Sequence, residues 1–273
     1  MAQGCRLMAV LRFTILGCGS SGGVPRLGGH WGSCDPDNPK NHRQRCSMLV
    51  ERVDGDAVTR VLIDASPDLR AQLLKAGIGE LDAVVFTHQH ADHVHGIDDL
   101  RMIVFNMRRR LAVWADAETQ DALITRFGYA FVQPEGSPYP PILDLHMLDG
   151  PVTITGAGGM VTLKPFRVGH GSIDSLGFRV GGLAYLPDVA EMYDESWAAV
   201  AGLDVWVLDS LRRTPHPTHT HFAQSLDWIK RAAPARAVLT NMHIDLDYAE
   251  ICAESPENVT AAFDGMVIEL ETE

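Results

Sequence analysis

The sequence predicts an α/β protein in which two β-sheets pack between layers of helices. Short runs of strand-forming residues dominate both halves of the 273-residue chain, and helical stretches lie between them. No linker or internal repeat divides the chain, so we expect one domain spanning residues 1–273. In a single parallel sheet, strands and helices would alternate more regularly than they do here, which favours two sheets.

The first half of the chain begins with a strand and a glycine-rich loop. We expect residues 1–9 to form a poorly structured extension, followed by a strand at 11–16 and a loop at 17–25. The loop matches GxGxxG formally, but Pro25 and further glycines follow it, so no helix can begin there to receive a dinucleotide. We interpret it as a loop whose backbone passes close to a metal site or a phosphate, or as a plain tight turn. The other elements expected in this half are strands 46–51, 60–64 and 81–86 and helices 66–77 and 97–103.

The second half is richer in strands. We expect strands at 111–114, 152–154, 161–163, 177–180, 183–186, 205–208, 237–240 and 267–270, and helices at 116–127 and 222–232. Residues 129–141 combine aromatic residues with proline and glycine, a composition that fits no regular element. We predict a flap or loop there that could overhang a pocket.

Charge and composition exclude several classes of protein. The formal net charge of −12 argues against broad binding to nucleic acid or to an anionic membrane surface. No run of about 18 apolar residues predicts a transmembrane helix. The five cysteines form no CxxC pair and their number is odd, which favours a reducing, cytoplasmic location over a disulfide framework. A homodimer is compatible with the sequence.

A dense group of potential metal ligands follows the strand expected at 81–86. His88, His90, Asp92 and His93 lie within six residues of one another, in a chain that has only 12 histidines. Neutral imidazole nitrogens and carboxylate oxygens are ligands that suit zinc, manganese and iron. The sequence therefore predicts a metal site, although a pH-sensitive histidine cluster on a loop is the alternative.

Three further candidate ligands stand in the same context, directly after an apolar run. They are His170, Asp188 and His243. Together with the first four they make seven ligands, which exceeds the roughly four that one zinc ion takes. The set suits two divalent ions, Zn²⁺ or Mn²⁺, about 3.5–4 Å apart, with Asp188 bridging them.

The HxHxDH motif after a strand, followed by His, Asp and His at later strand ends, resembles the metallo-β-lactamase superfamily over nearly the whole chain. This resemblance implies a four-layer αββα sandwich. It also implies a division of the ligands, with His88, His90 and His170 on one ion, Asp92, His93 and His243 on the other, and Asp188 on both.

A closer resemblance rests on GCGSSGGVP at residues 17–25, Tyr185–Asp188 and His221. These features are similar to those of the phosphoribosyl cyclic phosphate phosphodiesterases, and more distantly to those of the tRNA 3′-processing endonucleases. The resemblance implies that His221 is the general acid. Those phosphodiesterases also hold a structural zinc through three cysteines and a histidine. Here only Cys34 and, in the place of the histidine, Leu246 are found, so the zinc is not expected and the substrate is in doubt.

The chemistry of the ligands fits hydrolysis of a small phosphodiester or cyclic phosphate, nucleotide-like molecules included. A metal-bridging hydroxide would be the nucleophile, and two ions would neutralise charge on the phosphoryl oxygens. We expect His221, Asp92 and Asp188 to be catalytic, and Ser175, Arg212 and His219 to contact substrate. Asp64 and Asp209, both at strand ends, could orient histidine ligands.

Two other functions remain open at this point. The same metals could hydrolyse a lactone or a thioester, because the superfamily does both kinds of chemistry. A noncatalytic binding or carrier protein is the third possibility, since a protein of the pyrroloquinoline quinone pathway has a similar glycine loop. A tRNA nuclease is disfavoured, because the net charge is negative and no long basic arm is visible.

Overall fold

The computed structural model describes residues 9–272, and the extension predicted at the N-terminus lies outside the described residues apart from Ala9. The first sheet has the order β14 (Met266–Glu271), β1 (Val10–Gly17), β2 (Ser47–Asp54), β3 (Ala57–Ile63), β4 (Ala83–Val85), β5 (Leu111–Ala115) and β6 (Leu143–Met147). The second has the order β13 (Val259–Ala261), β12 (Arg236–Thr240), β11 (Val205–Asp209), β10 (Leu183–Leu186), β9 (Ile173–Val180), β8 (Gly159–His170) and β7 (Val152–Gly156).

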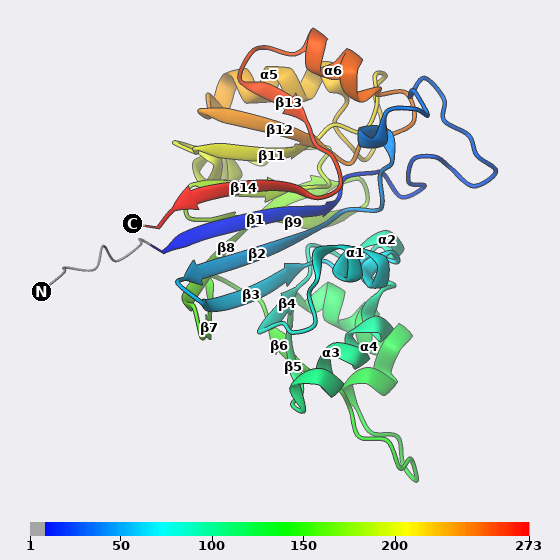
Figure 1. The fold of residues 1–273 in the computed structure, drawn as a ribbon, viewed down its shortest axis with the longest axis vertical. Coiled ribbons are helices and arrows are strands. Elements are labelled where there is room, and N and C mark those ends of the chain that lie inside the picture. Colours follow the sequence, from blue (N-terminus) through cyan, green and yellow to red (C-terminus); the bar gives the residue numbers. More distant parts are fainter. Residues whose placement is uncertain (1–8, 273) are drawn as a thin grey trace, which may run out of the picture.

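Helices cover both outer faces of the paired sheets (Figure 1). Against the first sheet lie α1 (Leu69–Ala76), α2 (Ala91–Val94), α3 (Leu100–Met107) and α4 (Ala117–Phe131). Against the second lie α5 (Phe222–Ala232) and α6 (Tyr248–Glu254). Short 3₁₀ turns occupy Pro39–Asn41, Ile97–Asp99 and Asp194–Val200. The predicted four-layer αββα sandwich is confirmed.

Alternating side chains explain why both faces of the first sheet are covered. Val61 and Ile63 of β3 point into the core between the sheets, which also contains Phe178 of β9. Leu62, between them, belongs to the separate core beneath the helices. Successive residues of a strand face opposite sides of a sheet, so an almost unbroken apolar strand needs a cover on each face.

Strand direction brings several strand ends to one edge. Strands β3 to β6 are parallel in the first sheet, and β10 to β13 are parallel in the second. The carboxyl ends of parallel neighbours lie at the same edge of their sheet, where α/β proteins commonly place ligands. The loops after β3, β4, β10, β11 and β12 therefore form one rim of the sandwich.

Most of the predicted elements are present, and the differences concern short elements and one helix start. The first helix begins at Leu69 and not at residue 66, because the Ser66 hydroxyl accepts a hydrogen bond from the backbone N–H of Asp68 (3.2 Å) and forms a turn. Strands β6 and β13 and helix α6 were not predicted. They are short, and the 3-residue β13 and 7-residue α6 give little room for a periodic pattern.

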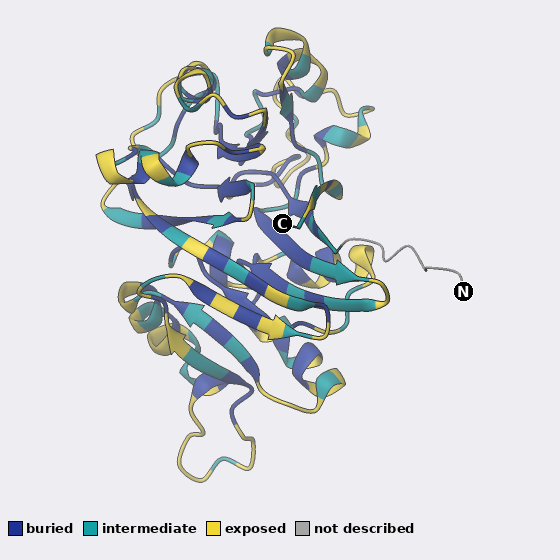
Figure 2. Ribbon diagram, turned by 90° about the vertical axis from the view of Figure 1, so that its left-hand side faces the viewer, coloured by how far each residue is buried: buried dark blue, intermediate teal, exposed yellow. Residues whose placement is uncertain are grey.

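The predicted flap is a projecting loop. Tyr129 and Phe131 belong to α4, and the following residues extend away from the sandwich as an exposed loop (Figures 1 and 2). None of residues 132–141 lines the cavity at the candidate site described below. No helix within residues 9–272 combines the length and the apolar character needed to cross a membrane.

Candidate functional site

Polar side chains from both sheets meet at the rim where the parallel strands end. They are His88 and His90 after β4, Asp92 and His93 in α2, His170 at the end of β8, Asp188 after β10, Asp209 at the end of β11 and His243 after β12. Residues more than 100 positions apart in the sequence thus share one site, and the fold brings candidate ligands from the two sheets to the same point.

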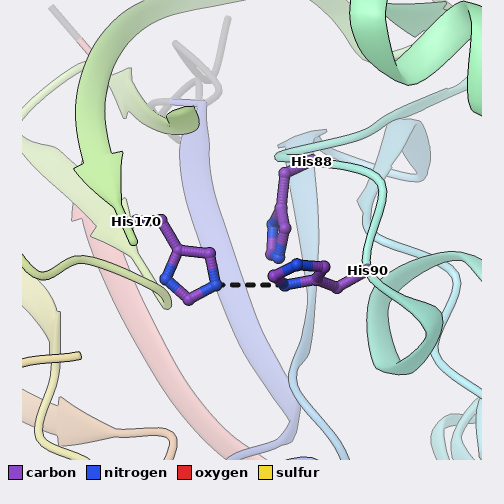
Figure 3. Close-up of side chains that lie close together, drawn as sticks. All are labelled: His88, His90 and His170. Carbon is purple, nitrogen blue, oxygen red and sulfur yellow. Dashed lines mark hydrogen bonds between the residues drawn. The ribbon is translucent and has the colours of Figure 1, made fainter. Parts of the chain in front are cut away.

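The first metal-capable group consists of His88, His90 and His170, whose ligand atoms all lie within 4.8 Å of one another. Figure 3 shows the three imidazoles converging, with His170 approaching from the second sheet. The Nε2 of His170 lies 3.0 Å from the Nδ1 of His90. Burial lowers the pKa of all three histidines, so their neutral rings offer lone pairs to a cation.

Asp188 belongs to two further groups that overlap the first. One joins it to His88 and His93, and the other joins it to His170 and His219. Asp188 is 2% exposed, so its carboxylate sits at the buried centre of the cluster. A carboxylate shared by neighbouring groups of histidines is the arrangement expected of a ligand that bridges two ions.

Orphaned polar atoms test whether this cluster fits a metal. The Nε2 atoms of His88 and His93 and the Oδ2 of Asp188 are buried and make no hydrogen bond. The Nε2 of His93 lies 2.9 Å from Asp188 Oδ2, yet neither atom has a hydrogen-bond partner. Buried polar atoms without partners are costly, and a cation between them would satisfy all three. The residues present therefore fit a divalent metal, and the cluster could hold one.

Asp64 holds Thr87 and the candidate ligand His93 of the first sheet. Its backbone has a positive φ of 64° just after β3, which turns the carboxylate back toward the loop that follows β4. The carboxylate accepts hydrogen bonds from the N–H and hydroxyl of Thr87 (both 2.8 Å) and lies 2.7 Å from the Nδ1 of His93. The structure places Asp64 against the candidate ligand His93, as its predicted orienting role requires, whereas Asp209 contacts His219. By holding Nδ1, Asp64 leaves the Nε2 of His93 facing the cluster.

His219 sits beside the cluster and is held by Asp209. The Nδ1 of His219 lies 2.8 Å from Asp209 Oδ2 and 3.6 Å from Asp188 Oδ1. Burial lowers the pKa of His219, but the carboxylate of Asp209 outweighs it, so the pKa stands at about 9. An imidazole held by a carboxylate in this way is well suited to keep a proton at neutral pH.

His221, the predicted general acid, has different surroundings. It is the N-cap residue of α5, and its Nδ1 is buried without a hydrogen-bond partner. Among the described residues it joins no metal-capable group, and it does not line the adjoining cavity. The structure thus places His219, and not His221, next to Asp188.

Asp92 and His243 line a cavity of about 160 Å³ that adjoins the cluster, together with His219. The Nδ1 of His243 lies 3.0 Å from Asp245 Oδ1, so Nε2 is the atom that could bind a metal. These two residues belong to none of the metal-capable groups of the described chain. They adjoin the cluster and stand as candidates for the second ion.

Arg26 enters the same cavity, and sequence analysis missed it. Its Nη2 contacts the Nε2 of His243. Its side chain passes over Gly22, where an added Cβ would come within 3.3 Å of the guanidinium Nε. The only signal in the sequence is its position directly after the 17–25 loop, so the glycines of that loop make room for an arginine.

The predicted substrate contacts have different surroundings. Ser175 is 2% exposed, and its Oγ lies 3.4 Å from the Nδ1 of His88. This position behind a ligand favours a role in orienting His88 over contact with substrate. Arg212 lines the cavity, but its guanidinium donates to the carbonyls of Thr214 (3.0 Å) and Pro215 (2.5 Å) in its own loop.

Comparison with known proteins identifies the family. Residues 59–244 match the family model of the β-lactamase superfamily domain. The chain belongs to that superfamily. Its metallo-β-lactamase fold is shared with a solved diphosphatase from the PhnP family, with 32% identity, a TM-score of 0.85 and coverage of 97% of this chain and 99% of that one.

Two curated relatives are named for activities other than that of a diphosphatase. The octanoyltransferase of Porphyromonas gingivalis W83 is 35% identical over 263 residues, which are 94% of this chain and 51% of that protein. A ribonuclease Z of Bradyrhizobium sp. ORS 278 is 30% identical over 145 residues, or 51% of this chain and 45% of that protein. The chain thus spans about half the length of these curated relatives.

Proposed function

We propose that the protein is a metal-dependent hydrolase that cleaves a small phosphodiester with two divalent ions, Zn²⁺ or Mn²⁺. The observation that carries this proposal is the buried Asp188, which two groups of histidines share. Its Oδ2 and the Nε2 atoms of His88 and His93 lack hydrogen-bond partners. The similarity of the whole chain to a diphosphatase of the same fold supports phosphorus chemistry.

For the two ions we keep the division of ligands that the family resemblance implies. One ion would be held by His88, His90 and His170, and the other by Asp92, His93 and His243, with Asp188 on both. Bound metal would lower the pKa of a water molecule to near 7 and neutralise charge on the phosphoryl oxygens. The protein's own contribution is to lower the pKa of His88, His90 and His170 by burial, which keeps them neutral, and to orient His93, His219 and His243 through Asp64, Asp209 and Asp245.

We further propose that His219 takes the role predicted for His221 and protonates the leaving oxygen. His219 lines the cavity next to Asp92, and Asp209 occupies its Nδ1, so Nε2 remains to donate a proton. Asp209 also favours the protonated ring, which a general acid requires.

Arg26 is proposed to bind a phosphate oxygen of the substrate. A guanidinium has no acceptor and is always charged, so it cannot share His243 Nε2 with a cation. In the loaded site Arg26 must turn from this nitrogen toward the cavity, where a bound phosphate is the anion that would receive it.

Arg26→Met should weaken substrate binding more than turnover. A hydrogen bond to a charged group contributes about 1.5–3 kcal/mol, so KM for an aryl phosphodiester should rise roughly 10- to 100-fold with a smaller change in kcat. Steady-state kinetics measure this split, and metal analysis should find the metal content kept. Arg101→Met is the matched control. It removes an exposed ion pair between Arg101 of α3 and Asp98 of the preceding 3₁₀ turn. An unchanged KM in Arg26→Met would exclude the contact.

Hydrolysis of an acyl bond is the second candidate function, because one relative is named an octanoyltransferase, an enzyme that transfers an acyl group. That relative is about twice as long as the matched region, so its name can belong to the other half. The deciding experiment strips the protein of metal, restores Zn²⁺ or Mn²⁺, and compares kcat/KM for bis(4-nitrophenyl) phosphate with that for an aryl thioester and a lactone. Metal-dependent turnover of the diester supports the first proposal, and a preference for the acyl substrates would overturn it.

A further inference from the structure

Arg43 is a buried arginine that lies behind His243. Arg43 is only 2% exposed, and burying an isolated charge costs free energy. Its guanidinium donates to the carbonyl of Leu246 (2.7 Å), to the carbonyl of His243 (3.3 Å) and to the side-chain oxygen of Asn41 (3.1 Å). The two carbonyls belong to the turn that carries the candidate ligand His243.

A second layer of contacts compensates the charge of Arg43. Asn41 donates from Nδ2 to Asp247 Oδ2 (2.6 Å), while its own Oδ1 also accepts from the N–H of Tyr248 (2.8 Å). Asp247 caps α6 by accepting from the N–H of Ala249 (2.8 Å). Within residues 9–272 Arg43 forms no direct ion pair, so its charge reaches Asp247 only through Asn41.

The backbone of Arg43 ties the glycine loop to the same place. Its N–H and carbonyl exchange hydrogen bonds with Val24 (both 2.9 Å), and an added Cβ on Gly19 would lie 2.9 Å from the Cβ of Arg43. On the other side of the loop, the N–H of Met242 donates to the carbonyl of Cys18 (2.9 Å). Arg43 thus joins the loop that carries Arg26 to the turn that carries His243.

We infer that Arg43 is a positioning residue that fixes His243 as a ligand of the second metal ion. The inference rests on the proposed function, in which His243 binds that ion. His243 is held at two points, with its carbonyl bonded by Arg43 and its Nδ1 facing Asp245. Loss of the guanidinium would free the carbonyls of His243 and Leu246 at once, and the turn would lose the geometry that presents Nε2. The planar fork of arginine reaches several acceptors together, which a lysine cannot reproduce.

Metal titration of the full-length Arg43→Met variant tests this role. Residues that support a metal ligand typically change metal affinity by about 10- to 100-fold. We expect the second equivalent of Zn²⁺ to bind roughly 10- to 100-fold more weakly, and the first equivalent, held by His88, His90 and His170, to keep its affinity. Calorimetric titration of the metal-free protein and elemental analysis after dialysis give both values without an activity assay.

Arg179→Met is the matched control. Arg179 also donates to backbone carbonyls, those of Gly181 (3.1 Å), Ala199 (3.1 Å) and Ala201 (2.8 Å), but it lies at the far end of the sandwich. This variant should lower the melting temperature and still bind two equivalents with wild-type affinity. If Arg43→Met does not fold, Arg43→Lys carries the test, with the second equivalent at least tenfold weaker.

The outcomes separate the inference from the proposed function. Two tight equivalents in the Arg43 variants, with two in the wild type, would overturn the positioning role and leave the two-metal proposal intact. A wild-type protein that binds a single equivalent would overturn both.

Discussion

Asp188→Asn is expected to remove nearly all metal-dependent hydrolysis. Asparagine keeps the shape of the side chain but removes the negative charge that two groups of histidines share. Removing one partner of a buried charged pair costs about 3–5 kcal/mol. At 1.4 kcal/mol per factor of ten, metal affinity should fall by roughly 10²- to 10³-fold or more. Elemental analysis and kcat/KM on an aryl phosphodiester measure the two effects.

Asp227→Asn provides the control for the change in charge. Asp227 lies on the exposed face of α5, so its replacement alters the net charge equally and leaves the cluster alone. It should retain the metal content and the rate of the wild type. Full metal content and full activity in Asp188→Asn would mean that the ions, if two are bound, do not share this carboxylate.

His219→Ala is the second change with a large expected effect. A general acid contributes about 10²- to 10⁴-fold when the leaving group needs a proton. The rate on an alkyl phosphodiester should fall by roughly that factor, whereas a 4-nitrophenyl leaving group departs without a proton and should lose little. The ratio of the two kcat/KM values, measured for wild type and variant, is the decisive readout.

His221→Ala is the comparison for this experiment, because sequence analysis assigned the acid to His221. It should change the two rates equally, through stability alone. The opposite result, with a selective loss on alkyl esters in His221→Ala, would restore the sequence-based assignment.

The carboxylate of Asp209 gives a pH test of the same role. A general acid works while it is protonated, and Asp209 raises the pKa of His219. Asp209→Asn should lower that pKa, so the alkaline limb of the rate profile should move to lower pH. A profile that does not move would separate His219 from proton transfer.

The ligands were easier to predict than their partners. His88, His90 and His93 are close in sequence, and His170 and Asp188 follow apolar runs, so pattern alone selected as candidate ligands five of the six residues that the structure brings into metal-capable groups; His219 is the sixth. The choice between His219 and His221 depends on which one meets Asp209, a contact between a strand end and a loop that spacing does not encode.

The contacts of Arg43 could not be predicted from sequence motifs either. Cys34 and Leu246 stand where related enzymes hold a structural zinc, so no such zinc is expected from the sequence. Nothing in the sequence indicates what takes its place. In the structure the guanidinium of Arg43 lies 3.8 Å from the Cys34 sulfur and donates to the Leu246 carbonyl, a contact that becomes visible only when three distant segments are folded together.

The fold was predictable where strands alternate between two cores, as β3 does with Val61, Leu62 and Ile63. Helix α6 was missed because it is set by its Asp247 cap and by packing against β13, and not by a long periodic pattern. The loop after α4 was recognised as irregular, but its direction follows from tertiary structure alone.

The candidate ligands come from different sheets, with His88 and His93 after β4 of the first, and His170 at the end of β8 and Asp188 after β10 of the second. A metal ion in this cluster would therefore cross-link the two sheets of the sandwich, in addition to its role in catalysis. Free metal at 100 times its dissociation constant would add about 2.7 kcal/mol to the free energy of unfolding. Chelation would remove the same amount, so the resistance of the fold to heat and to proteolysis would follow the metal supply around it.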